Sequence, residues 1–166
     1  MDKTKNENYF NESEKKCMEK LKEFNDGTGF FKSLTDKNAT AEKTVEGDAS
    51  GYTSDGRIVL IEMKNRNINL FDYETVYINA KKVAKMMLEH SIKKTVPLFI
   101  SFFKNGEVAI WRLDRITKYK YYPSVKAFSR GYNKDEYSEQ IGLYPEDAIV
   151  YENNNGNWSR KFYEFG

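Results

Sequence analysis

Cysteine, proline and long apolar runs are scarce in this chain. It has one cysteine, Cys17, and three prolines in 166 residues. A single thiol excludes an intrachain disulfide framework and a cysteine-rich zinc or iron–sulfur site. No apolar run approaches the roughly 20 residues that span a bilayer, and the first residues are polar and charged. These absences predict a cytoplasmic protein without a membrane segment.

Glycine is present but does not form a phosphate-binding loop. Gly27 and Gly29 have the wrong spacing for one, so no organic cofactor is expected. The net charge is only +2, so any surface for nucleic acid must be local. Charged residues make up 31% and aromatic residues 15%, a mixture typical of a folded domain. The length predicts one domain over 1–166, with a core over about 10–113 and an elaboration over about 114–166.

Hydrophobic periodicity predicts a mixed α/β (α+β) fold. Residues 11–25 have helical spacing, and 73–91 form a second helix that Asp72 caps. The best strand is 57–64, which is almost continuously apolar and suits the centre of a sheet. Further strands are expected at 30–34, 45–53, 96–103, 107–113, 148–152 and 158–165, with turns at 54–56 and 105–106. A short helix or loop is expected between 114 and 147.

An acid precedes an acid-x-base triplet across the predicted hairpin. Glu62 and Lys64 point to one face of their strand, since side chains alternate. If the turn at 54–56 pairs the two strands, Asp48 lies near Glu62. Two carboxylates suit Mg²⁺ or Mn²⁺, and a lysine beside them can act on water or phosphate. A salt-bridged strand end, from Glu62 to Lys64 or Arg57, is the alternative.

These residues resemble the motif of the PD-(D/E)XK nuclease superfamily, and in particular small archaeal-type Holliday junction resolvases and phage nucleases. The resemblance covers about residues 10–103. It implies a restriction-endonuclease-like core in the order helix, strand, strand, strand, helix, strand, with extra C-terminal strands. The pattern that carries it is Glu14, then Asp48, then Glu62-Met63-Lys64, followed by Asn65-Arg66. Gly47 departs from the family, which has proline before the aspartate.

The resemblance also implies a role for each matching residue. Asp48 and Glu62 would be metal ligands, with the Met63 carbonyl assisting. Lys64 would be the catalytic lysine, and Glu14 an accessory acid on the core-facing side of the first helix, one turn before Cys17 and Met18. The cofactor would be Mg²⁺ or Mn²⁺, the partner DNA, and a homodimer is expected if the resolvase subgroup is right.

Candidate nucleic-acid contacts flank this cluster. Arg66 follows the triplet, and Lys81 lies one helical turn after Tyr77, so all three are predicted to contact DNA. A merely solvated surface arginine is the alternative for Arg66. Lys82 could also face the cleft and hold the DNA backbone, and a solvated charged helix face is the alternative for both lysines. The segment 118–122 alternates lysine and tyrosine, which fits either nucleic-acid binding or a half-exposed strand.

The sequence therefore predicts a phage or bacterial metal-dependent deoxyribonuclease that hydrolyses phosphodiester bonds, with branched DNA as one candidate substrate. Two alternatives stay open. One is a catalytically inactive nuclease-fold protein that binds nucleic acid or a protein. The other is an interaction domain in which the acids form only ion pairs. The sequence does not separate DNA from RNA.

Overall fold

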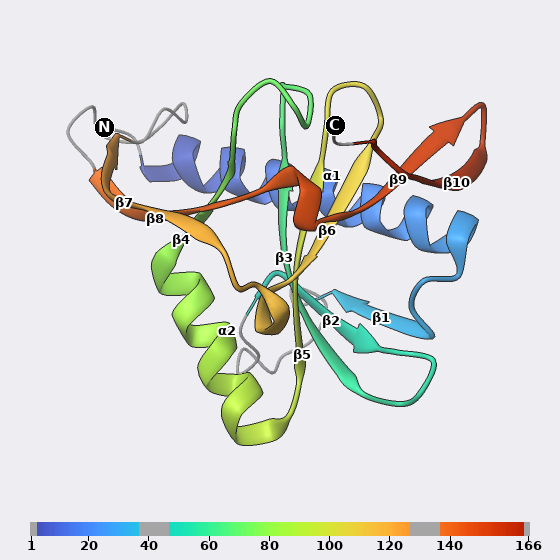
Figure 1. Cartoon of the computed structure of the whole chain (residues 1–166), viewed down its shortest axis with the longest axis horizontal. Helices are drawn as coiled ribbons and strands as arrows, with labels where there is room; N and C mark the ends of the chain where they lie inside the picture. Colours follow the sequence, from blue (N-terminus) through green and yellow to red (C-terminus); the bar gives the residue numbers. More distant parts are fainter. Residues whose placement is uncertain (1–2, 37–46, 127–136, 165–166) are drawn as a thin grey trace.

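The described part of the chain forms a seven-stranded mixed sheet, a smaller three-stranded sheet and two α-helices (Figure 1). The structure is a computed structural model and describes residues 3–36, 47–126 and 137–164. The elements are α1 (Lys3–Thr28), β1 (Ser33–Asp36), β2 (Ala49–Tyr52), β3 (Ile58–Asn65), β4 (Val76–Asn79), α2 (Ala80–Lys93), β5 (Val96–Phe102), β6 (Val108–Arg112), β7 (Tyr119–Lys126), β8 (Tyr137–Leu143), β9 (Ile149–Asn154) and β10 (Asn157–Lys161), with 3-10 turns η2 (Leu113–Arg115) and η3 (Pro145–Asp147).

The large sheet has the order β1-β2-β3-β5-β6-β9-β10, and the small sheet has the order β4-β8-β7. β3 and β5 are parallel, because α2 carries the chain back between them, whereas the other pairs are antiparallel. The mixed α+β fold predicted from the sequence is confirmed, and the order helix, strand, strand, strand, helix, strand is present. β4 is an additional strand in front of the second helix.

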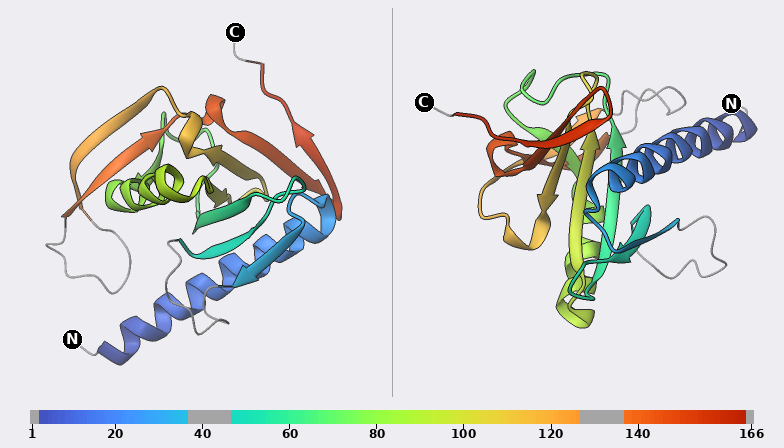
Figure 2. Two further views of the ribbon diagram at one scale, coloured as in Figure 1. Left: turned by 90° about the horizontal axis from the view of Figure 1, so that it is seen from below. Right: turned by 90° about the vertical axis from the view of Figure 1, so that its right-hand side faces the viewer.

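Helices cover the two faces of the large sheet (Figure 2). On β3, Ile61 and Met63 pack into one core with Leu21 and Phe24 of α1. Leu60 faces the other way and packs into a second core that includes Met86 of α2. Strand β3 therefore has helices on both sides, as its continuous apolar sequence predicted. None of the helices in the described part of the chain is long and apolar enough to cross a membrane.

The second helix begins later than predicted. Residues 76–79 form β4, which pairs with β8, and α2 starts at Ala80. The run Val76-Tyr77-Ile78 is β-branched and aromatic, so it favours a strand when an edge is available to pair with it. Asn79, and not Asp72, caps the helix, because its side chain accepts hydrogen bonds from the backbone N–H groups of Lys81 and Lys82.

The chain between η2 and η3 was also predicted incorrectly. The expected short helix or loop contains two strands, β7 and β8, which complete the small sheet with β4. Residues 119–122 of the segment that alternates lysine and tyrosine lie in β7, so the half-exposed strand is confirmed, and nucleic-acid binding by this segment stays a prediction. The strand expected at 30–34 begins at Ser33, and the first helix extends to Thr28. The start of the strand expected at 45–53 lies outside the described residues; the structure has β2 at 49–52.

Candidate active site

The site lies where β2 separates from β3. β2 pairs with Ile58–Ile61, the first half of β3, so residues 62–65 of β3 have no partner strand on that side among the described residues. Asp48 closes the end of the ladder. Its N–H donates to the Ile61 carbonyl at 2.7 Å, and its Oδ2 accepts from the Met63 N–H at 2.8 Å. These two bonds fix the Asp48 carboxylate beside the exposed strand edge.

Met63 presents its carbonyl to the same edge. In a strand, the N–H and C=O of one residue point to the same side. Since the Met63 N–H bonds Asp48, the Met63 carbonyl also opens toward Asp48, while its side chain is buried under α1. The three oxygen donors that the sequence predicted as metal ligands, from Asp48, Glu62 and Met63, therefore come from one short stretch of β3 and the end of β2.

Gly47 makes this arrangement possible. Its φ is +97°, and a Cβ atom built there would lie 2.8 Å from the Ile61 carbonyl oxygen. Proline has φ near −65° and could not adopt this conformation. The glycine that stands where the similar motif has proline thus has a physical reason, since a glycine turn brings Asp48 to β3 in this chain.

We expect Gly47→Ala to destabilise the fold by about 2–3 kcal/mol, because it adds a close contact to a positive φ. Gly56→Ala is the matched control. Gly56 has φ +84°, but a Cβ there meets nothing within 4 Å, so the cost should be about 1 kcal/mol. Urea unfolding of both variants measures the difference. Equal losses would show that the contact with Ile61 does not constrain the turn.

Glu62 is the buried acid of the site, with 2% of its surface exposed. Across the sheet it stands in register with Phe99 and then Trp111, whose rings stack at 5.5 Å. Its carboxylate accepts a hydrogen bond from the Lys82 ammonium. Burial raises the pKa of Glu62, and the negative charge of Asp48 raises it further, whereas Lys82 lowers it. The site thus holds an acid that gains from any nearby cation.

Two lysines face this acid with opposite pKa shifts. The protein around the Lys64 ammonium removes part of its hydration, and this, with the charge of Lys82, lowers the pKa of Lys64. Burial acts in the same direction on Lys82, but the charges of Glu62, Asp48 and Glu14 outweigh it and raise the pKa of Lys82. Lys64 therefore gives up a proton more easily than a free lysine, and Lys82 less easily.

Helix α1 borders the site on its other side. Lys20 donates to the Asn65 side chain at 2.7 Å, which ties α1 to the end of β3. Burial and the charge of Asp48 raise the pKa of Cys17 to about 11, so this thiol stays protonated at neutral pH. Glu14 lies one turn earlier and is exposed, contrary to the core-facing position expected for it. Its charge nevertheless acts on Lys82, across the open edge of β3.

From the sequence, Lys82 is expected only as a candidate contact to the DNA backbone beside Lys81, and its contact with Glu62 is a finding of the structure. Both lysines have exposed side chains, and of the two it is Lys82 whose ammonium contacts Glu62. Tyr77 lies in β4, so the helical spacing expected between Tyr77 and Lys81 does not exist. The capping preference of Asn79 and the strand-like run before it are the signals in the sequence that place Lys82 in the first turn of the helix.

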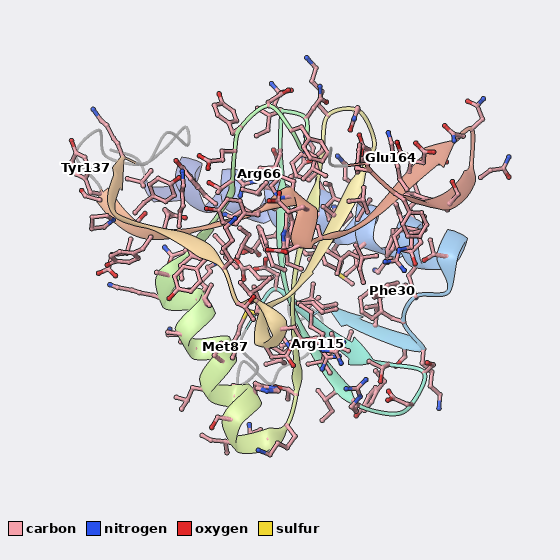
Figure 3. All side chains as sticks on the ribbon, in the orientation of Figure 1. Phe30, Arg66, Met87, Arg115, Tyr137 and Glu164 are labelled. Atoms are coloured by element: carbon pink, nitrogen blue, oxygen red, sulfur yellow. The ribbon has the colours of Figure 1, made fainter. Side chains whose placement is uncertain are left out.

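Arg66 and Tyr77, two of the predicted DNA contacts, form a hydrogen bond with each other. The Arg66 guanidinium donates to the Tyr77 carbonyl, and burial lowers the pKa of Arg66 to about 10. Figure 3 labels Arg66, which directly follows β3. The Tyr77 ring lies 4.8 Å from that of Tyr122. Thus Arg66 links β3 to the small sheet, and the two tyrosines form an aromatic surface beside the start of α2.

The donors present fit a divalent cation. Two carboxylates and one backbone carbonyl are hard oxygen ligands, and they leave positions for water and phosphate, which Mg²⁺ retains. A cation between Asp48 and Glu62 would also relieve the repulsion that raises the pKa of Glu62. The described residues contain no group of three or more His, Cys, Asp or Glu side chains around one point, so the carbonyl and solvent would have to complete the coordination.

Comparison with known proteins gives a similarity to a solved structure. No protein-family model matches the chain. No curated protein matches it either. Among solved structures, it is similar to Hjc, a Holliday junction resolvase from the archaeal hyperthermophile Archaeoglobus fulgidus. The match covers 67% of this chain and 80% of that one, with a TM-score of 0.40 and 10% sequence identity.

Proposed function

We propose that this protein is a metal-dependent nuclease that hydrolyses phosphodiester bonds in DNA. The observation that carries the proposal is that the Asp48 carboxylate lies close enough to the buried Glu62 for its charge to raise the pKa of Glu62, with Lys64 on the same face of β3. A buried acid is costly unless a cation offsets its charge. Such an acid, a second carboxylate and a lysine of lowered pKa form the set of groups that metal-assisted phosphodiester hydrolysis uses.

Each residue of the site has its own role in the proposed reaction. Asp48, Glu62 and the Met63 carbonyl would hold Mg²⁺ or Mn²⁺, which when bound would activate water and neutralise phosphate charge. Lys64 has a lowered pKa, so its amine is suited to take a proton from water or to pair with the scissile phosphate. Lys82 stays charged, orients the Glu62 carboxylate and adds positive charge where the phosphate would lie. Glu14 would act as an accessory acid through Lys82.

A surface for the substrate extends from this site over the small sheet. Tyr77 and Tyr122 offer ring faces for bases, and Lys120 lies on the same face of β7 as Tyr122. Lys81 is exposed at the start of α2 and is suited to a phosphate contact. Branched DNA is the proposed substrate subgroup, and a homodimer is proposed with it, since a symmetric junction suits a two-fold enzyme.

The alternative is a nuclease-fold protein that binds nucleic acid or another protein without cleaving. Its motivation is the Glu62–Lys82 ion pair, which satisfies the buried acid without metal. Beside this ion pair, however, the charge of Asp48 still raises the pKa of Glu62, and a cation between the two carboxylates would oppose that effect.

The test is cleavage of supercoiled plasmid, single-stranded DNA, a four-way junction and RNA, with MgCl₂, MnCl₂ or EDTA. We expect metal-dependent cleavage that EDTA abolishes. Lys82→Met should lower the rate by about 10²-fold, because it removes the group that holds Glu62 and a cation near the phosphate. Lys81→Met is the matched neighbour, and its rate should stay within about threefold, as expected for one exposed phosphate contact.

Failure to cleave any of these nucleic acids with either metal would contradict the proposal and favour the binding-only alternative. Equal rates for Lys82→Met and wild type would place catalysis away from Glu62. The preferred substrate among the four would identify the subgroup.

A further inference from the structure

A cavity of about 360 Å³ lies at the other end of β3 from the candidate active site. Arg57, which lines it, directly precedes β3, whereas Glu62 lies five residues further along. At about 3.3 Å per residue this is roughly 17 Å. The cavity is therefore separate from the carboxylate pair, and its volume falls in the range of small-molecule sites, roughly 300–1,000 Å³.

The inner wall of the cavity is apolar and belongs to the core under α1. Four of its residues are at most 5% exposed, namely Phe31, Val96, Leu98 and Ile110. They come from the segment before β1 and from the adjacent strands β5 and β6, so rigid elements hold them in place. Such a wall suits a hydrocarbon chain or ring and offers nothing to a charged group.

The rim carries three arginines, and two of them are already paired. Arg57 donates to Asp55 at 3.0 Å, and Arg112 makes two hydrogen bonds to Asp114, at 2.9 and 3.0 Å. Arg115 has no ion pair or side-chain hydrogen bond to any residue in the described ranges 3–36, 47–126 and 137–164. Figure 3 labels Arg115 and Phe30, two residues that line the cavity from distant parts of the chain.

We propose that this cavity binds a small amphiphilic anion, a carboxylate with an apolar body, whose charged end pairs with Arg115. A guanidinium without a protein partner binds a carboxylate strongly, often through two hydrogen bonds. Thr117 also lines the cavity, and its hydroxyl can donate to the same carboxylate, whereas the hydroxyl of Thr53 already donates to Asp55. This inference does not rest on the proposed nuclease function.

Asp147 also lines this cavity, and its negative charge favours a different ligand. If the charge of Asp147 outweighed that of Arg115, an amphiphilic cation would bind in place of an anion. The probes therefore share one apolar chain and differ in the head group: octanoate, octylamine and octanol, with acetate as the head group without a chain. Binding is measured by calorimetry, and the methyl resonances of Leu98, Ile110 and Ile116 report where the probe lies.

Octanoate should bind with a stoichiometry of one and shift those methyl resonances, at least about tenfold more tightly than octanol, octylamine or acetate. Arg115→Gln should weaken octanoate about tenfold or more and leave octanol unchanged. Arg160→Gln, an exposed arginine of β10 that does not line this cavity, should leave both unchanged.

Three results would overturn the proposal. These are octylamine or octanol binding as tightly as octanoate, octanoate binding that Arg115→Gln does not weaken, and no binding of octanoate to the wild-type protein. Because Arg115 is exposed, Arg115→Gln should fold normally, and its thermal unfolding can be checked beforehand. Cleavage of DNA is not a readout of this experiment, so its outcome is independent of the nuclease proposal.

Discussion

Glu62→Gln and Lys64→Ala should each lower the rate of DNA cleavage by about 10²–10⁴-fold. Glu62→Gln keeps the shape of the side chain but removes the charge that would bind metal and attract Lys82. Lys64→Ala removes the amine whose pKa the site lowers. The measurement is single-turnover cleavage of the preferred substrate at saturating Mg²⁺.

The control for this loss of cleavage is the stability of the folded Glu62→Gln protein. Glu62→Gln removes a buried acid whose pKa is raised, so the metal-free variant should be at least as stable as wild type at neutral pH. The sign follows from the shift: a carboxyl with a raised pKa binds its proton more tightly in the folded state, so its ionisation costs stability as pH rises past its ordinary pKa. A variant that kept wild-type cleavage would remove Glu62 from the mechanism.

Metal binding can be followed in the same variants. We expect Mg²⁺ or Mn²⁺ to raise the unfolding temperature of wild type, because an ion that binds only the folded state stabilises it by mass action. Glu62→Gln should lose most of this shift, whereas Lys64→Ala should keep it, since Lys64 is not a proposed ligand. This contrast separates loss of the metal from loss of the amine.

Trp111→Ala should be among the most destabilising single changes, at about 3–5 kcal/mol. Trp111 is fully buried in the core under α2, and its ring stacks on that of Phe99. Its Nε1 donates to the Tyr144 carbonyl at 2.9 Å, so alanine would also leave a carbonyl unpaired. Urea unfolding gives the loss of free energy, and thermal unfolding should fall by roughly 10 °C or more.

Trp111→Phe divides this effect into two parts. It keeps most of the buried ring but removes the hydrogen bond to Tyr144, so about 1–2 kcal/mol should be lost. Because Phe99 stands between Trp111 and Glu62 across the sheet, a cavity at Trp111 should also loosen the apolar surroundings of Glu62. A loss below 1 kcal/mol in Trp111→Ala would mean that the second core closes around the gap.

Part of the site could be predicted from the sequence because it depends on interactions between residues that are close along the chain. Side chains alternate along a strand, so an apolar run that ends in Glu62-Met63-Lys64 places the acid and the lysine on one face. The turn at 54–56 pairs the preceding strand with β3, and this brings Asp48 beside Glu62. The turn at Asn105-Gly106 was likewise visible, since such turns depend on the residues within them.

Other features depended on partners far along the chain. Val76–Asn79 is a strand because β8, some sixty residues later, offers an edge, and that pairing overrode the helical pattern expected for 73–91. The same shift of the helix start decided that Lys82, and not Lys81, meets Glu62. Glu14 acts on this lysine only because α1 passes the open edge of β3.

The sequence by itself thus determined the mixed α+β class, the central strand and the acid-x-base face, which arise from alternation and turn chemistry among near neighbours. The tertiary structure decided which cation meets the buried acid, why a glycine precedes Asp48, and where the arginine-rimmed cavity lies. The physical reason is that burial, charge pairing and close backbone approach are properties of the space between elements, which no single segment encodes.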